Sequence, residues 1–235
     1  LPALSFKGLG LDRVHSALQI VGVFLLGFFG ERFARGLARL QDKMPPFGDT
    51  EARKVLAEEF GAPAGELFAE LGPPVAAASI AQVHKAELCD GRQVAVKLLR
   101  PNIERRMRAD TLLFFALANI MEWVAPGLRR LKLVTAVEQF VEISDIELDL
   151  RMEAAAAGRL ADNLSEDEGI HVPWVDLEHS TSRMLVIEWI EGIRIDDVAA
   201  LRAAGHDIGQ LTEAAANSFF NQVFRDGFFH ADMHP

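Results

Sequence analysis

Apolar and polar residues alternate most clearly at residues 94–99, which read VAVKLL and predict a β-strand. The alternation places Val94, Val96 and Leu98 on one face of this strand and Lys97 between apolar residues on the other. Burial of a lone ammonium group is unfavourable, so a buried Lys97 needs an anion nearby. From this strand alone, a lysine on a solvated face remains the alternative interpretation.

Turn and helix-terminating residues divide the rest of the chain into elements. We expect helices over residues 49–60, where Asp49 or Thr50 can act as the cap, and over 64–71. A β-region over 75–99 contains an Asp-Gly turn. Longer helices are expected over 101–124, 132–160 and 209–226, strands over 172–175 and 184–190, and a short helix after residue 192.

This order of elements is an α+β pattern in two lobes. We assign residues 1–48 to an N-terminal helical extension, 49–192 to a first lobe with inserted helices, and 193–235 to the start of a second lobe. The apolar run at residues 17–29 is shorter than the roughly 20 residues needed to span a bilayer. It predicts a buried or partner-packed helix, with a helix at a membrane surface as the alternative.

Composition narrows the functional classes. Half of the 235 residues are apolar and a quarter are charged, which is typical of a globular protein. The net charge of −10 argues against nucleic acid as the main partner. The single cysteine, Cys89, excludes an internal disulfide and suits a reducing compartment.

The segment before the strand lysine is rich in small residues. Residues 94–97 match the V-A-I-K pattern, in which the lysine holds ATP phosphates in kinases, and the preceding loop there is rich in glycine. Here the corresponding loop carries three alanines and Ser79. The pattern indicates a kinase-like nucleotide site whose glycines are replaced.

The anion for Lys97 is predicted from the helix over 132–160. Its apolar stripe runs through Leu133, Val137, Phe140 and Ser144, and the next step lands on Glu147. In kinases a helix glutamate pairs with the strand lysine, so Glu147 is the predicted partner. A solvated helix acid is the alternative interpretation.

Two further segments complete the pattern. In residues 184–192, MLVIEWIEG, backbone groups of Glu188 and Ile190 are where a kinase-like fold meets adenine, although any buried strand has a similar sequence. Near the C-terminus, His230-Ala231-Asp232 has the frame of the kinase catalytic loop, with Asp232 as the residue that orients the nucleophile. Alternatively, His230, Asp232 and His234 could bind zinc or iron.

Together these segments resemble the UbiB family of atypical kinase-like proteins, called ADCK in animals, from residue 40 onward. The family's alanine-rich loop is similar to residues 76–84, its E-x-D motif to residues 147–149 with the following E-A at 153–154, and its F-F-H-A-D-x-H-P segment to residues 228–235. The resemblance implies an α+β, atypical protein-kinase-like two-lobe fold with an N-terminal helical extension, truncated in its second lobe. In this family Glu153 would approach an N-terminal K-x-G-Q motif.

The resemblance also implies an activity and a site. The family is associated with ATP or ADP binding, Mg²⁺-dependent ATPase or kinase-like activity, and ubiquinone or prenyl-lipid biosynthesis at membranes. It implies Asp232 as the catalytic residue. Nucleotide contacts are expected from Val75, Ala76, Ala77, Ala78, Ser79, Ile80, Ala81, Gln82, Val83, Lys97, Glu147, Glu188 and Ile190.

Partners and location follow from the same resemblance. We expect a nucleotide, a membrane surface, and prenyl-lipid intermediates or their biosynthetic enzymes as partners, with a cytoplasmic location at the inner membrane. No K-x-G-Q motif occurs in the chain, and the family's metal-binding asparagine would fall beyond Pro235. Mg²⁺ ligands are therefore expected beyond residue 235, and the polypeptide as written is expected not to turn over ATP. A non-catalytic nucleotide-binding scaffold and a metal-dependent hydrolase are the competing hypotheses.

Overall fold

The computed structural model describes residues 45–167 and 169–229. The apolar run at residues 17–29 lies outside this part of the chain, as do Asp232 and the histidines of the alternative metal site. Within the described residues, no helix combines the length and the apolar character that crossing a membrane requires.

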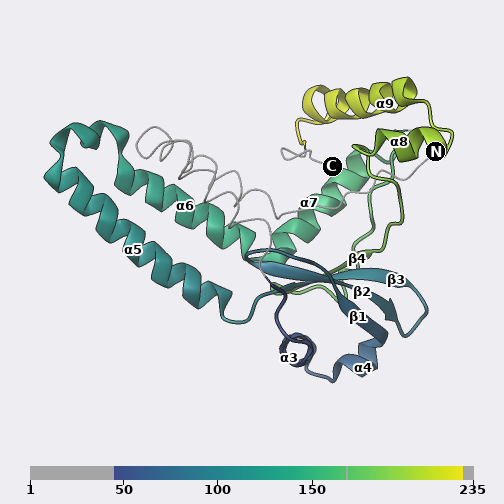
Figure 1. The fold of residues 1–235 in the computed structure, drawn as a ribbon, viewed down its shortest axis with the longest axis horizontal. Coiled ribbons are helices and arrows are strands. Elements are labelled where there is room, and N and C mark those ends of the chain that lie inside the picture. The colour runs from purple at the N-terminus through teal and green to yellow at the C-terminus, as the bar shows by residue number, and fades with distance from the viewer. Residues whose placement is uncertain (1–44, 168, 230–235) are drawn as a thin grey trace.

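A four-stranded antiparallel sheet forms the centre of the fold (Figure 1). Its strands are β1 (Phe68–Ala77), β2 (Ala81–Leu88), β3 (Gln93–Leu99) and β4 (Met184–Glu188), and they lie in this order across the sheet. The turn between β2 and β3 contains Gly91 with φ of 89°, a conformation that glycine adopts without steric cost. This turn and β3 lie where the sequence predicts them.

The first strand is longer than predicted. Helix α4 (Ala64–Leu67) ends four residues before the predicted end, and β1 begins at Phe68. The pairing of β1 with β2 shifts register around residues 71–76, where Pro73 and Pro74 cannot donate backbone hydrogen bonds. β1 tolerates these prolines because it is an edge strand of the sheet.

The two faces of the sheet pack against different helices, as the alternation in β3 predicts. Val94, Val96 and Leu98 join a core with Val55 and Leu56 of α3 (Asp49–Phe60). On the other face, residues of β3 and β4 pack against the start of α7 (Leu150–Asn163), and this second core contains Leu99, Ile103, Leu148, Leu150, Ala154 and Leu185. Lys97 therefore belongs to the face that α7 covers.

A long helical hairpin separates β3 from α7. It consists of α5 (Ile103–Val124), the 3₁₀-helix η1 (Pro126–Leu131) and α6 (Leu133–Glu147), and it projects away from the sheet (Figure 1). The bounds of α5 and its end before Pro126 agree with the prediction. The buried side chain of Ala118 and an edge contact between the rings of Phe114 and Phe140 mark the side of α5 that packs on α6.

The single helix predicted over residues 132–160 is wrong, because the chain forms two helices here. α6 ends at Glu147 and α7 begins at Leu150, with Asp149 between them as the N-cap. The Asp149 carboxylate accepts a hydrogen bond from the backbone N–H of Arg151 at 3.1 Å. The break gives α7 a new direction: its start packs on the sheet, and the helix then runs towards α8 and α9 (Figure 1).

The remaining elements follow the sheet and α7. The strand predicted at 172–175 is reduced to one bridge, between Val175 and Ile187 of β4. Helices α8 (Val198–Ala203) and α9 (Ile208–Phe220) follow, and the π-helical turn η2 (Asn221–Arg225) extends α9. The predicted helix over 209–226 is therefore an α-helix whose last turn changes type.

Candidate functional site

The centre of the candidate site is a buried ion pair between Lys97 of β3 and Glu153 of α7. The Lys97 Nζ lies 2.6 Å from Glu153 Oε2, and the two side chains are 6 % and 12 % exposed. Burial raises the pKa of the Glu153 carboxyl, and the attraction and hydrogen bond of Lys97 act in the opposite direction. The sequence argument that Lys97 needs a nearby anion is thus confirmed.

The predicted partner of Lys97, however, is corrected. The described carboxylate partner is Glu153 rather than Glu147. The prediction extended the stripe of α6 by one step, but α6 ends at Glu147, and the next helix approaches Lys97 through its own first turn. An N-cap aspartate at 149 was the available signal of this break. The role of Glu147 at a nucleotide site stays a prediction.

Small and apolar residues lie beside the ion pair. The strand register puts Ala76, Val83 and Lys97 in one row across the sheet, on the same face. In the adjacent row on this face, Ala95 of β3 pairs with Ile187 of β4. An apolar surface next to a buried cation can accept a planar ring together with an anionic group.

The segment from Val75 to Val83, predicted as a loop, is mostly strand. The chain reverses only at residues 78–80, because Val75 and Ala77 belong to β1 and Ala81 opens β2. Arg100, which the sequence analysis did not select, fixes this turn. Its Nε donates to the Ala78 carbonyl at 2.8 Å, and its Nη2 donates to the Pro45 carbonyl at 3.0 Å.

Two predicted contact residues lie on the opposite face of the sheet from Lys97. Ala77 and Gln82 pair with each other, and Gln82 pairs with Leu98, whose side chain packs in the core against α3. Gln82 is buried there, and its Oε1 accepts a hydrogen bond from the Phe47 backbone N–H at 2.9 Å. The side chains of Ala77 and Gln82 therefore face away from Lys97, and the role of these two residues in covering a nucleotide stays a prediction.

The hydrogen bonds around Gln82 also show which ring nitrogen of His84 carries the proton. The His84 Nδ1 lies 2.8 Å from the Gly72 carbonyl oxygen, which can only accept, so Nδ1 carries the proton. The His84 Nε2 lies 2.8 Å from the Gln82 amide nitrogen and accepts its hydrogen. His84 is therefore a neutral structural residue that ties β2 to β1.

The predicted adenine contacts at the end of β4 are only partly available. The backbone N–H of Glu188 donates to the Trp174 carbonyl at 2.9 Å, so it is not directed to a ligand. The Glu188 carboxylate lies 2.7 Å from Nε2 of His171. The Glu188 N–H is thus already used within the fold, and the adenine contacts of the remaining backbone groups of Glu188 and Ile190 stay predictions.

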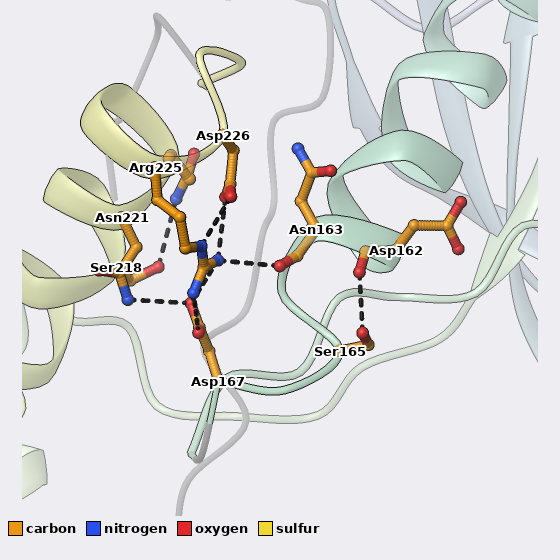
Figure 2. A network of polar contacts seen from close by, with 9 residues as sticks. Asp162, Asn163, Ser165, Asp167, Ser218, Asn221, Arg225 and Asp226 are labelled. Atoms are coloured by element: carbon orange, nitrogen blue, oxygen red, sulfur yellow. Dashed lines mark hydrogen bonds and ion pairs between the residues drawn. The ribbon is translucent and has the colours of Figure 1, made fainter.

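A second polar network, centred on Arg225 of η2, holds the last helices against the end of α7 (Figure 2). The Arg225 guanidinium contacts Asp167 at 2.6 Å and Asp226 at 2.7 Å, and it donates to the Asn163 carbonyl at 2.9 Å. Its hydrogen bonds lower the pKa of both aspartates. The sequence analysis did not select Arg225.

This network stands at the entry to the segment that carries the predicted catalytic residue. Beyond η2, the Phe228 N–H donates to the Gln222 carbonyl at 3.1 Å, and the Arg159 guanidinium lies 4.4 Å from the centre of the Phe228 ring. Asp232 itself lies outside the described residues. The described part thus positions Phe228 by a contact with α7 and Phe229 by a ring contact with Phe219 of α9.

The described carboxylates near Lys97 do not form a metal site. Glu153 pairs with Lys97, and Asp149 contacts the Arg151 side chain at 2.6 Å. Among the residues that the structure describes, no group of three or more His, Cys, Asp or Glu side chains could hold a metal ion. The expected Mg²⁺ ligands and the alternative zinc or iron site at His230, Asp232 and His234 lie outside the described residues and stay predictions.

The fold and this site define a class. An antiparallel sheet with a strand lysine paired to a helix glutamate is a kinase-like arrangement. A solved structure titled "The complex structure of Rv3197-erythromycin from Mycobacterium tuberculosis" matches the chain with a TM-score of 0.57 and 31 % identity. The match covers 80 % of this chain and 46 % of that one. The chain has a kinase-like α+β fold.

The family follows from sequence comparison. Residues 39–235 match the ABC1 atypical kinase-like domain, and the chain belongs to this family. It is 41 % identical to a "Probable protein kinase UbiB" of Marinobacter nauticus, over 95 % of this chain and 43 % of the relative. It is also 41 % identical to the protein of the same name in Vibrio cholerae, over 97 % and 44 %. The chain spans less than half the length of these relatives.

Proposed function

We propose that this chain provides the nucleotide-binding part of a UbiB-type atypical kinase or ATPase that supports ubiquinone or prenyl-lipid biosynthesis at a membrane. The observation that carries the proposal is the buried Lys97–Glu153 pair beside an apolar surface. In this role Lys97 neutralises nucleotide phosphates, and Glu153 keeps the ammonium group in place. The UbiB names of the relatives support the kinase class.

The alanines of the β1–β2 hairpin are proposed to shape this site. Ala76 lies in the same row as Lys97, and its methyl group limits how closely phosphates approach the backbone. The turn at residues 78–80 is fixed by Arg100 rather than left free. Mg²⁺, when bound, would supply electrostatic stabilisation of the phosphates, and its ligands are expected beyond the described residues.

Nucleotide binding tests this proposal directly. Calorimetric titration of the chain with ADP should give saturable binding that weakens at least tenfold in Lys97→Met, because the cation is lost. Ala76→Leu should weaken it as well, since it adds volume beside Lys97 and leaves the ion pair intact. Lys54→Met is the control, because Lys54 is an exposed lysine of α3. Equal affinity in all four proteins would contradict the proposal.

Catalysis and scaffolding are separated in the full-length protein. Asp232→Asn should abolish support of prenyl-lipid synthesis in cells if the protein acts as an enzyme. Retained synthesis, with ADP binding intact, would favour the non-catalytic scaffold. For the hydrolase hypothesis, stoichiometric zinc or iron that disappears in His234→Ala would be required.

The membrane partner is proposed to contact the outer side of α5. Leu113, Leu117, Ile120 and Val124 are exposed at spacings of four, three and four, so they form one stripe, distinct from the side that packs on α6. We call these four residues the α5 stripe. Near its end, Trp123 is 76 % exposed. Tryptophan at the end of an apolar stripe is typical of membrane interfaces.

Charge favours an anionic membrane as the occupant of this surface. The tip of the hairpin carries Arg129, Arg130 and Lys132, all exposed. Residues 103–132 contain six Lys or Arg and three Asp or Glu, although the whole chain has a net charge of −10. Half of this positive charge lies at the tip, where the apolar stripe ends and residues 123–132 contain no Asp or Glu, which suits lipids with anionic head groups.

Vesicle flotation tests this contact. The chain should float with vesicles of phosphatidylglycerol and phosphatidylcholine more than with phosphatidylcholine alone, and the preference should fall in Arg129→Gln/Arg130→Gln. Leu117→Ser/Trp123→Ser should reduce flotation on both vesicles. Phe224→Ser is the control, because Phe224 is equally exposed but lies on η2. A dimer in light scattering that Leu117→Ser disrupts would instead assign the α5 stripe to a second copy.

A further inference from the structure

A cleft of ≈ 650 Å³ lies at the root of the helical hairpin, where α5 and α6 approach the loop before β4. Its floor is mainly apolar and includes Met107 of α5 and Val141 and Leu148 from α6 and its end. Lys97 and Glu153 are not among its lining residues, so the cleft is separate from the candidate nucleotide site. Its volume lies in the range of small-molecule sites.

One polar group on the floor is unsatisfied. Ser144 lines the cleft and is only 5 % exposed. Its Oγ has no hydrogen-bond partner in the described part of the chain. Buried polar groups nearly always have a partner in folded proteins, so an orphan hydroxyl in a cleft indicates a ligand that supplies one.

The rim of the cleft defines the charge of such a ligand. Glu104, Arg108 and Asp145 line it and are exposed. Within the described part of the chain these three side chains form no ion pair, and the further lining carboxylate of Asp149 is paired with Arg151. This leaves two carboxylates against one guanidinium. This excess of negative charge disfavours an anion, and the apolar floor disfavours a strongly polar molecule.

We propose that this cleft binds a neutral amphiphilic small molecule, whose apolar body covers Met107, Val141 and Leu148 and whose hydroxyl or carbonyl group bonds to the Ser144 hydroxyl. The ligand enters between α5 and α6. It contacts Leu148, which ends the hairpin at the break before α7. The site is independent of nucleotide, and its binding is measured without any.

The test uses two probes of the same shape. 1-Naphthol carries a hydroxyl where 1-methylnaphthalene carries a methyl group, so only the first can bond to Ser144. Ligand-observed NMR titration of the chain should show 1-naphthol binding about fivefold more tightly, as one hydrogen bond warrants. In Ser144→Ala this preference should disappear while the chain keeps its circular dichroism spectrum.

A second pair of variants locates the site. Val141→Phe fills the floor of the cleft and should abolish binding of both probes. Ile143→Phe adds a ring to the same helix at an exposed position outside the cleft and should leave binding unchanged. Equal affinity for the two probes, an unchanged preference in Ser144→Ala, or full binding by Val141→Phe would each overturn the proposal.

Discussion

The two ends of α7 are held by ion pairs that differ in the number of partners and in the exposure of the cation. At its first turn, one buried contact joins Glu153 to Lys97, and both side chains are almost inaccessible. The last residue of α7 is Asn163, and its carbonyl accepts a hydrogen bond from Arg225 of η2. The Arg225 guanidinium, which is 43 % exposed, also contacts Asp167 and Asp226. In the second arrangement one bond satisfies a C-terminal carbonyl of α7 and the others join side chains, which is typical of a structural contact.

This comparison indicates a functional role for the Lys97–Glu153 pair and a stabilising role for the Arg225 network. A buried ion pair gains little net stability, because desolvation of both charges opposes their attraction. Its retention in an apolar core is therefore better explained by a requirement for a positioned cation than by folding. The Arg225 network requires no such explanation, because its guanidinium is 43 % exposed and its two aspartates, 12 % and 9 % exposed, are compensated by several hydrogen bonds.

The largest expected effect is the loss of one partner of the buried pair. Lys97→Met leaves the Glu153 carboxylate uncompensated and should lower the free energy of unfolding by about 3–5 kcal/mol. The double variant Lys97→Met/Glu153→Leu should regain most of this loss, because it removes both charges. Urea denaturation at pH 7.5 measures both. Equal destabilisation in the single and the double variant would show that the pair itself stabilises the fold.

Opposite pH dependences provide the second test. The pKa of Glu153 is raised in the folded state, so its contribution is fully present below 4.5 and is lost as pH rises through the folded value. The pKa of Asp167 is lowered, so its contribution is present above 3.8 and is lost as pH falls through the folded value. Glu153→Gln should therefore flatten stability above pH 4.5, whereas Asp167→Asn should flatten it below pH 3.8.

These two effects are measured by urea denaturation between pH 3 and pH 7. The informative quantity is the difference in free energy of unfolding between each variant and the parent chain at the same pH. A Glu153→Gln difference that does not change with pH would mean that the carboxyl is not desolvated in solution.

The smallest expected effect concerns the network around Arg225. Arg225→Lys keeps the charge but loses the simultaneous contacts of the guanidinium, so it should destabilise the chain much less than Lys97→Met. Because the Arg225 guanidinium is 43 % exposed, the difference from the parent chain should shrink in 1 M NaCl, where screening acts over about 3 Å. The cost of Lys97→Met should change little with salt. Urea midpoints at low and high salt distinguish the two.

The sequence predicted those elements whose local pattern agrees with their packing. The alternation in β3 identified the face of Lys97, and Pro126 marked the end of α5. The first part of β1, before residue 75, was missed because Pro73 and Pro74 are disfavoured inside a strand, and the position of β1 at the sheet edge makes them tolerable.

The partner of Lys97 could not be obtained from periodicity alone. The stripe of α6 leads correctly to Glu147, but the break at Asp149 gives α7 a new direction, and tertiary packing on the sheet decides which acid meets the lysine. The contacts of Arg100 and Arg225 join residues 55 and 58 positions apart, and no local pattern predicts them.

The helical hairpin begins and ends in the same core, since Ile103 and Leu148 pack together beneath the sheet. The contact between the two ends of the segment does not depend on the length of the chain between them. Each doubling of that length adds only about 0.6 kcal/mol to the entropic cost of bringing the ends together. The reach of the hairpin tip can therefore be lengthened or shortened by whole helical turns while Lys97 and Glu153 keep their places.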